Sequence, residues 1–306
     1  MQQCKPVVAP MSGDASASAS EVACPICGSL RTRDWRIPRD AAIRRCRSCG
    51  ARFNFPVPSR VSLKQRYEHD HSIGRYDARP LVPEYESRAR LLTRIAGGVP
   101  GRVLDVGCGE GGFLDAIRHL GWTTFGIDIA ETAIASTSTR HVRLVGELDT
   151  IRERPLFDAV TFWDVLEHLE EPARALQQAR ARLRPGGVVA VTMPNVAGAM
   201  SRCSGARWAY YDFSRYGHLH HLAPRHIRTL FRRTGFKVVY QETRGSVDLR
   251  SIPQLYGSSA PGESTAWVLD KLSGVLAKIA VPLGFGNVLL MIGITAPGAS
   301  HARSRF

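Results

Sequence analysis

Two pairs of cysteines are the first residues in this sequence whose spacing points to a particular chemistry. Cys24 and Cys27 form one C-x2-C pair, and Cys46 and Cys49 form a second pair after an 18-residue spacer. A glycine follows each pair, so a tight turn can aim backbone amides at the sulfur atoms. Two such turns can hold a tetrahedral Zn2+ through four thiolates, with no open coordination position. We predict a structural zinc site; disulfides, or buried thiols unrelated to a metal, are the alternatives.

A glycine-rich turn between a strand and a helix is the second such group. Residues 103–114 read VLDVGCGEGGFL, an apolar run followed by clustered glycines and the start of a helical pattern. Glycines let a ligand approach the backbone, and the free amides of a helix N-terminus bind polar groups. Asp105 lies near the end of this run, and Asp128 ends the next one, where a carboxylate can accept both hydroxyls of a ribose. The combination predicts a nucleoside-containing cofactor.

The motifs that follow make this chain resemble the class I S-adenosylmethionine-dependent methyltransferases. The family motif V-L-D-x-G-C-G-x-G is met at every fixed position, and FDAV (157–160), DVLEHLEEP (164–172) and LRPGG (183–187) follow in order. An NAD-binding domain, the alternative for the glycine turn, would lack these later motifs. The resemblance implies S-adenosylmethionine as cofactor and a Rossmann-like α/β fold with a doubly wound, mostly parallel, seven-stranded sheet. Carried over, the cofactor-binding residues would be Asp105, Gly107, Cys108, Gly109, Gly111, Asp128, Ile129, Glu147, Leu148 and Trp163.

The cysteine array and this core together resemble a subgroup of bacterial methyltransferases, the type 23-like enzymes with an N-terminal Cys4 zinc ribbon. The shared features are Pro194-Asn195 after the fifth strand, a Trp-containing insert, the stretch GHLHHL (217–222) and Gly235-Phe236 after a helix. Such enzymes often act on cell-surface polysaccharides or secondary metabolites. Because their substrates are diverse, the resemblance implies methyl transfer without naming the acceptor.

Histidines are the candidate bases. Methyl transfer is an in-line displacement from a sulfonium, so the enzyme orients the acceptor and can remove its proton. We predict catalytic roles for His168, which ends the Leu-Glu-His motif, and for His220 and His221; His218 is also plausible. A structural role for His168, as an anchor of the following helix, is the alternative.

A catalytic divalent metal is a secondary possibility. Asp164, Glu167 and His168 have the spacing i, i+3, i+4 and would converge if they shared one helical turn. With His220 or His221 they could hold an ion, as in the similar quinol and RNA-end methyltransferases that carry E-x-x-E-H. The first acid here is the shorter Asp, and Glu-His also occurs in relatives without a metal.

The positive charge is concentrated in two segments. The chain has 41 Lys and Arg against 27 Asp and Glu, a formal net charge of +14, and residues 31–60 and 202–233 carry almost all of the excess. The second segment overlaps an insert, 196–223, which in this fold covers the acceptor pocket, so we predict an anionic acceptor. The first segment leaves a nucleic-acid partner open, although we do not favour it.

Three hypotheses for function follow. The leading one is O-methylation of a small or carrier-linked anionic metabolite such as a sugar or a phenol. The second is an RNA methyltransferase that docks through the Arg-rich ribbon. The third is a non-catalytic protein-binding module.

Periodicity predicts the elements that must position these groups. Apolar runs at 102–106, 123–127, 142–145, 157–163, 188–193, 236–241 and 288–296 alternate with helical patterns, including 84–96 and 224–234, which is typical of a parallel sheet covered on both faces. We predict a disordered tail (1–20), a zinc ribbon (21–58), a polar connector (59–83), a methyltransferase domain (84–298) and a second tail (299–306).

Neither end of the chain predicts a membrane span. Residues 1–20 are Ala- and Ser-rich without an apolar core, so we predict a cytoplasmic protein. The uncharged stretch 279–300 is interrupted by prolines and glycines that a lipid-exposed helix would not tolerate. An amphipathic helix over 265–281 is predicted to pack on its own domain, with peripheral membrane contact as the alternative.

Overall fold

A computed structural model describes residues 22–35, 43–72, 82–151, 156–245, 249 and 263–296. Its centre is a seven-stranded sheet with the order β10-β11-β8-β7-β4-β5-β6. The strands are β4 (Arg102–Val106), β5 (Thr123–Asp128), β6 (Val142–Val145), β7 (Phe157–Trp163), β8 (Leu183–Pro194), β10 (Phe236–Arg244) and β11 (Val288–Thr295). Strands β4 to β8 pair in parallel, while β11 is antiparallel to both β8 and β10. The predicted fold class is thereby confirmed.

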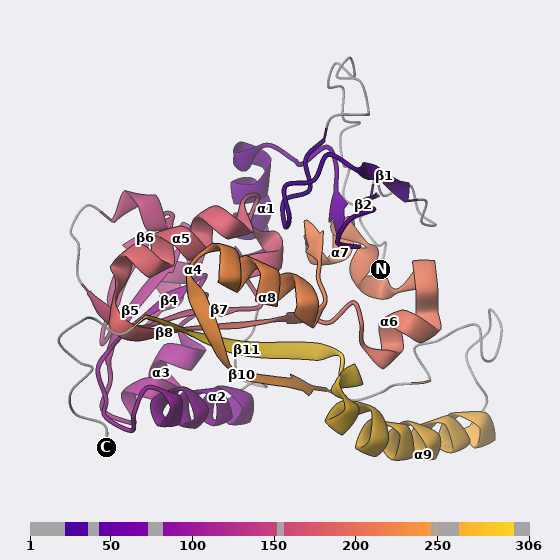
Figure 1. The fold of residues 1–306 in the computed structure, drawn as a ribbon. Coiled ribbons are helices and arrows are strands. Elements are labelled where there is room, and N and C mark those ends of the chain that lie inside the picture. Colours follow the sequence, from indigo (N-terminus) through magenta and orange to yellow (C-terminus); the bar gives the residue numbers. More distant parts are fainter. Residues whose placement is uncertain are drawn as a thin grey trace.

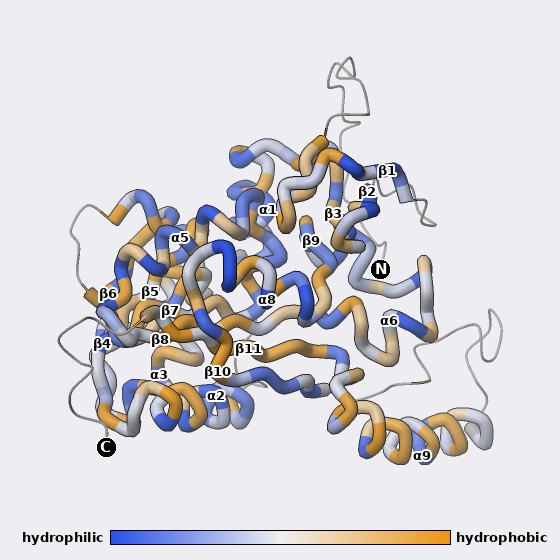
Figure 2. Tube along the Cα trace, in the orientation of Figure 1, coloured by the Kyte–Doolittle hydropathy of each residue, from blue (hydrophilic) through white to orange (hydrophobic). Residues whose placement is uncertain are grey.

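Helices cover both faces of this sheet (Figure 1). They are α2 (Val82–Ile95), α3 (Gly112–Arg118), α4 (Glu131–Ser136), α5 (Pro172–Arg182) and α8 (Pro224–Arg233). Successive strand residues point to opposite faces: Val103 packs with α2 and α3, and Leu104 packs with α5 and α8. The apolar strands therefore lie between two hydrophobic layers, visible as the orange centre of Figure 2.

A second, four-stranded sheet has the order β1-β2-β3-β9. Strands β1 (Thr32–Trp35), β2 (Ile43–Cys46) and β3 (Arg52–Asn54) come from the cysteine-containing segment, whereas β9 (His220–His221) comes from the insert after β8. The register pairs Arg52 with His221 and Phe53 with His220. The cysteine-containing segment is thus joined by shared backbone pairing to the domain that contains the central sheet.

The segment predicted as a polar connector contains a helix, α1 (Arg60–Ser72). It lacks a continuous apolar stripe and is held by polar contacts instead. The Glu68 carboxylate accepts hydrogen bonds from the backbone amides of Glu131 (2.6 Å) and Thr132 (3.2 Å) at the start of α4, and the Lys64 ammonium lies 3.0 Å from the Glu131 carboxylate. Hydrophobic periodicity could not reveal a helix of this kind.

The insert after β8 and the segment between β10 and β11 complete the fold. The insert contains α6 (Ala199–Ser204), 3-10 turns at Gly205–Arg207 and Ala209–Tyr211, and α7 (Phe213–Tyr216). Two further 3-10 turns lie at Leu148–Thr150 and Leu166–His168. Helix α9 (Glu263–Ala280) matches the predicted amphipathic helix and continues into a kinked turn, Val281–Phe285. Among the described helices, none is long and apolar enough to cross a membrane.

Candidate active site

A cavity of about 710 Å3 opens at the carboxyl ends of β4, β5 and β7. Ligands of open α/β sheets bind at this edge, and the volume is within the range of small-molecule sites. Helix α1 contributes Arg60 and Tyr67 to the wall, and the insert contributes Tyr216 and His218. Most of the predicted cofactor-binding residues line it: Gly107, Cys108, Gly109, Asp128, Ile129, Glu147, Leu148 and Trp163.

The glycine turn is held in place by Asp128. Its carboxylate accepts hydrogen bonds from the amide of Gly109 (3.0 Å) and from the amide of Ala130 (2.9 Å). Gly107 and Gly109 have φ values of 68° and 53°, in the left-handed region that favours glycine. Each carboxylate oxygen keeps a lone pair, so Asp128 can fix the turn and still bind ligand hydroxyls.

Asp105 and Gly111 do not line the cavity. The Asp105 carboxylate is buried beneath the turn and accepts a hydrogen bond from the Thr161 hydroxyl at 2.6 Å. Burial raises the pKa of Asp105 to about 7. At Gly111, where φ is 85° and α3 begins, an added Cβ would lie 2.9 Å from the Thr137 methyl carbon. These two residues shape the turn from behind instead of meeting a ligand.

His168 stands at the cavity wall with one ring nitrogen engaged. Its Nδ1 lies 3.2 Å from the carbonyl oxygen of Gly217 and 3.3 Å from the hydroxyl of Tyr67. A carbonyl can only accept, so Nδ1 carries the proton and Nε2 keeps its lone pair. Burial, reinforced by the neighbouring His218, holds the pKa of His168 well below its ordinary value. The imidazole is therefore neutral at pH 7.

His218, which the sequence offers as a further plausible base beside the three predicted catalytic histidines, lines the same cavity. Its ring centroid lies 4.8 Å from that of His168, and it stacks on Tyr216 at 5.6 Å with an interplanar angle of 16°. Burial lowers the pKa of His218 to about 4. The signal for it was present in the sequence, because His218 opens the GHLHHL stretch directly after the aromatic insert.

The expected catalytic role of His220 and His221 does not fit their positions. Both are buried in β9, outside the cavity lining. The His220 Nε2 lies 2.8 Å from the carbonyl oxygen of Leu169, and the His221 Nε2 lies 3.4 Å from Asn54 Oδ1. The pairing of β9 with β3 directs these side chains into the junction between the two sheets, where they bind structural partners.

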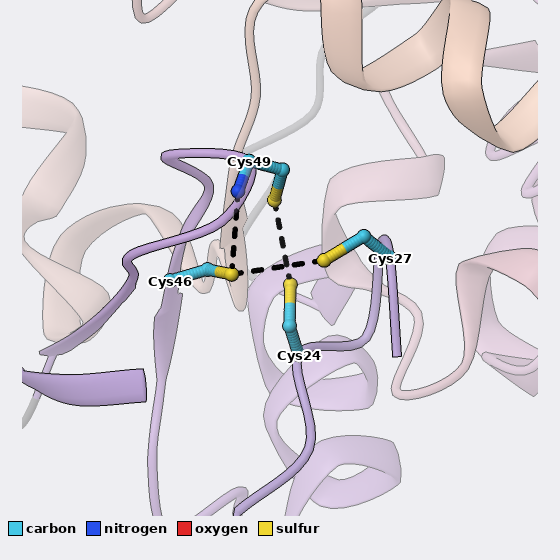
Figure 3. Close-up of side chains that lie close together, drawn as sticks. All are labelled: Cys24, Cys27, Cys46 and Cys49. Atoms are coloured by element: carbon cyan, nitrogen blue, oxygen red, sulfur yellow. Dashed lines mark hydrogen bonds between the residues drawn. The ribbon is translucent and has the colours of Figure 1, made fainter. Parts of the chain in front are cut away.

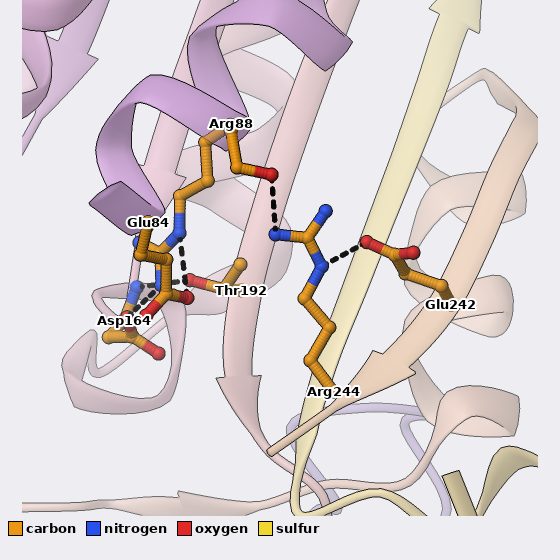
Figure 4. Close-up of polar contacts among 7 residues, drawn as sticks. Glu84, Arg88, Asp164, Thr192, Glu242 and Arg244 are labelled. Carbon is orange, nitrogen blue, oxygen red and sulfur yellow. Dashed lines mark hydrogen bonds and ion pairs between the residues drawn. The ribbon is translucent and has the colours of Figure 1, made fainter. Parts of the chain in front are cut away.

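The ligand set considered for a catalytic metal is not assembled. Asp164 precedes the 3-10 turn, has a φ of 57°, and binds the buried Arg88 guanidinium at 3.3 Å (Figure 4). Arg88 also binds Glu84 at 2.6 Å, so Asp164 belongs to a cluster around α2. The donor atoms that do gather, within 4.8 Å of one another, are those of Glu167, His168 and His218.

Glu167 is buried to 1% exposure, and within the described residues neither of its carboxylate oxygens has a hydrogen-bond partner. Burial, reinforced by the nearby Asp164 carboxylate, raises the pKa of Glu167 well above its ordinary value. The Trp163 Nε1 is another buried donor that no described residue satisfies. Trp163 is among the residues that line the cavity, but the Nε1 atom itself is buried.

Several cavity residues escaped prediction because of where they lie in the sequence. Arg60, Leu63, Tyr67 and His71 come from the unpredicted helix α1, and Tyr85 comes from the first turns of α2. Arg60 bridges the cavity mouth: its guanidinium lies 3.5 Å from the Glu147 carboxylate and 3.9 Å from that of Glu170. Spacing alone gives no sign that these residues meet.

The four cysteines converge as the spacing predicts (Figure 3). The sulfur atoms of Cys24 and Cys49, and those of Cys27 and Cys46, are 3.6 Å apart, and all four lie within 4.8 Å of one another. A disulfide would need about 2.05 Å, whereas bonds of about 2.3 Å to a tetrahedral zinc place sulfurs about 3.8 Å apart. The cluster therefore fits a zinc ion. Helix α8 supports it, because the His226 Nε2 lies 3.0 Å from the Cys49 carbonyl.

Comparisons with known proteins agree with this geometry. Residues 81–241, more than half of the chain, match the family described as a methyltransferase domain. Over 147 residues the chain is 30% identical to the ubiquinone biosynthesis O-methyltransferase of Alkalilimnicola ehrlichii, covering 41% of this chain and 60% of that protein. Over 110 residues it is 36% identical to a probable S-adenosylmethionine-dependent methyltransferase of Mycolicibacterium smegmatis, and the match covers 34% of this chain and 43% of that protein. The chain thus spans less than two thirds of these relatives.

Among solved structures, the chain resembles 1,6-didemethyltoxoflavin-N1-methyltransferase from Burkholderia thailandensis. The TM-score is 0.52 at 14% sequence identity, and the alignment covers 86% of this chain and 99% of that one. At this identity the likeness concerns the fold alone.

Proposed function

The chain belongs to the class I S-adenosylmethionine-dependent methyltransferases, and from this premise we propose that it O-methylates a small or carrier-linked anionic acceptor. The observation that carries the proposal is one cavity in which the glycine turn, the Asp128 carboxylate and the neutral imidazole of His168 meet. That arrangement combines a nucleoside site with a base that needs no prior deprotonation.

Residues of the cavity floor would hold the cofactor, which when bound supplies an electrophilic methyl group on a sulfonium. The turn Gly107–Gly109 would receive its methionine portion, and Asp128 would accept the ribose hydroxyls. Glu147 and Leu148, after β6, would border the adenine. The lone pairs that remain on the Asp128 carboxylate support this placement.

His168 is proposed as the base. The proton of the acceptor hydroxyl would pass to the His168 Nε2 as that oxygen takes the methyl group that the cofactor would supply. The Gly217 carbonyl keeps Nδ1 protonated, which fixes the tautomer that this transfer needs. Because burial lowers the pKa of His168, the ring is a weak base that is fully unprotonated at neutral pH.

The acceptor side of the cavity supports a planar, negatively charged substrate. Tyr67, Tyr85, Trp163 and Tyr216 provide aromatic surface, and Arg215 provides a cation. Other aromatic residues of the insert serve packing: Trp208 and Tyr211 are only 5% and 2% exposed and lie in one apolar cluster with Met200. A phenol bearing a carboxylate or phosphate combines the required features.

A structural zinc ion is proposed for the four cysteines, on the strength of their converging sulfur atoms. The basic residues of this segment are partly used within the fold. Arg44 is 4% exposed, and the Arg52 guanidinium lies 4.3 Å from the Trp35 ring and donates to the Tyr211 hydroxyl. These contacts favour a joining role for the ribbon over RNA docking.

Methyl-labelled S-adenosylmethionine tests the proposal directly. We expect wild-type protein to transfer label to a member of a panel of carboxylated phenols, phosphorylated phenols and anionic sugars. The Asp128→Ala variant should neither bind cofactor by calorimetry nor transfer label. If the wild type binds the cofactor and labels amine analogues but no hydroxyl compound, O-methylation is contradicted. If the wild type does not bind the cofactor, the proposed methyltransferase activity itself is contradicted.

A further inference from the structure

Helix α9 carries an exposed apolar face along its length. Val268, Leu272, Val275 and Ile279 are 46%, 49%, 56% and 55% exposed. At 100° per residue these four positions fall within about 60° of the helix circumference, and Leu276 lies beside them. They form a stripe, which we call the α9 face, that follows one side of the helix.

The α9 face is unusual for this molecule. Sixteen large apolar side chains of the described residues are exposed, and seven of them lie between Trp267 and Leu283. The others are scattered, as is ordinary for a protein surface. In Figures 1 and 2, α9 lies at the periphery, beyond the edge of the central sheet, with apolar residues along it. A contiguous exposed patch of this kind marks a surface that binds something apolar.

The opposite side of α9 is fixed to the body of the protein. Leu269 is 9% exposed and packs in one cluster with Met200, Trp208 and Tyr211 of the insert, to which Ala277 and Ala280 also contribute. The Ser273 hydroxyl donates to the Leu269 carbonyl at 2.6 Å and accepts from the Leu249 amide at 3.0 Å. The helix is therefore already docked through one face, and the α9 face is a second, outward one.

The charges around the α9 face distinguish its possible occupants. Lys271 and Lys278 border the stripe on one side, and Trp267 lies next to them, with the Lys271 ammonium 5.8 Å from its ring centroid. Lysines whose stems lie along apolar surface, with a Trp at the polar boundary, are typical of helices that lie in a membrane interface.

The size of the face disfavours a second protein copy. A helix of 18 residues is about 27 Å long, and a stripe about 10 Å wide covers only about 270 Å2. A stable protein interface buries about 800 Å2 on each partner and has few lysines at its centre. We propose that the α9 face docks on an anionic lipid surface, with the apolar stripe in the headgroup region and Lys271 and Lys278 at the phosphates. This inference does not depend on the proposed methyl transfer.

Vesicle co-sedimentation of the full-length protein tests the proposal. We expect binding to phosphatidylcholine vesicles that contain phosphatidylglycerol, and at least tenfold weaker binding to pure phosphatidylcholine, since each surface-near lysine contributes about 1 kcal/mol. Val275→Glu should weaken binding to the anionic vesicles by about tenfold or more. The matched control Val99→Glu, which changes an apolar side chain 73% exposed elsewhere, should bind as the wild type does. Lys271→Gln combined with Lys278→Gln should abolish the preference for anionic vesicles.

Fluorescence locates the contact. Brominated lipids should quench part of the tryptophan emission of the wild type, and Trp267→Phe should remove the quenched part. The proposal is overturned if wild-type protein stays in solution with anionic vesicles, or if Val275→Glu binds them as well as Val99→Glu does. It is also overturned if the wild type is a dimer that Val275→Glu dissociates while neither binds vesicles, because the face then belongs to a second copy.

Discussion

Histidines from one short stretch of the chain end in two different environments. His218 stands in the cavity beside His168, whereas His220 and His221 stand two and three residues later in the junction between the sheets. Burial lowers the pKa of all four, and for His218 and His220 it is lowered to about 4 in both cases. Residue type and the direction of the pKa shift therefore do not separate them. The partner of Nε2 does separate His220 from His168: at His220 it is a backbone carbonyl, and at His168 none is found among the described residues.

The molecule therefore has a cavity region, for which we propose ligand binding and reaction, and a junction region, which fixes the wall of that cavity. Substitutions in the cavity should alter binding or rate with little loss of stability. Substitutions in the junction should alter stability first and rate only through displaced cavity residues.

The largest effect is expected at Asp128. In Asp128→Ala, the cofactor Kd should rise at least about 100-fold, because the charge-assisted hydrogen bond that fixes the turn at Gly109 and the proposed bonds to the ribose are lost, each worth about 1.5–3 kcal/mol. Isothermal titration calorimetry measures this Kd. Glu86→Ala, at an exposed ion pair on α2, is the control and should leave Kd unchanged. Equal Kd values for the two variants would remove Asp128 from the binding site.

A second pair of variants separates the two kinds of histidine. His168→Gln should lower kcat by about 100-fold or more, the usual contribution of a general base, with the cofactor Kd almost unchanged. His220→Gln should leave kcat within about twofold and lower the melting temperature instead, since it removes a buried hydrogen bond to Leu169. If kcat falls further in His220→Gln than in His168→Gln, the catalytic role proposed for His168 and the structural role proposed for His220 are both contradicted.

Loss of a zinc ligand should have an intermediate effect. Cys46→Ser should reduce bound zinc, measured by elemental analysis, and lower the melting temperature. It should lower kcat by about tenfold, because β3 would no longer hold β9 and the neighbouring His218 would shift. Cys203→Ser changes an exposed cysteine and should do none of these. Full zinc content in Cys46→Ser would show that this thiol is not a ligand.

The smallest effect is a difference in the pH dependence of stability. Burial lowers the pKa of His220 to about 4, below its ordinary value of about 6.5, so between these values the unfolded chain binds a proton that the folded chain does not. The free energy of unfolding therefore falls as pH falls from about 6.5 to about 4, by about 1.4 kcal/mol per pH unit for this one group. Denaturant titrations should show that His220→Gln flattens this slope. Identical slopes would mean that His220 is not neutral in the fold.

The strands, and the edge of the sheet where Gly107 and Asp128 lie, could be predicted from the sequence because they depend on local pattern. The strands expected at 102–106, 142–145 and 157–163 have those bounds, and the ends of β4 and β5 bring Gly107 and Asp128 to one edge. Helix α1 and the two-residue strand β9 could not be predicted from the sequence. The first is held by Glu68 and Lys64 reaching α4, and the second exists only because β3 is present to pair with it.

By itself, the sequence determined the α/β core, the glycine turn with its acidic partner, and a four-cysteine cluster, since periodicity, turn residues and thiol spacing act within a few residues of one another. Only the tertiary structure decided which histidine faces the cavity, that Asp164 turns to Arg88, and that the ribbon shares a sheet with the insert. Those outcomes rest on pairs such as Arg52 and His221, which are far apart in the chain, and their meeting depends on the packing of whole elements.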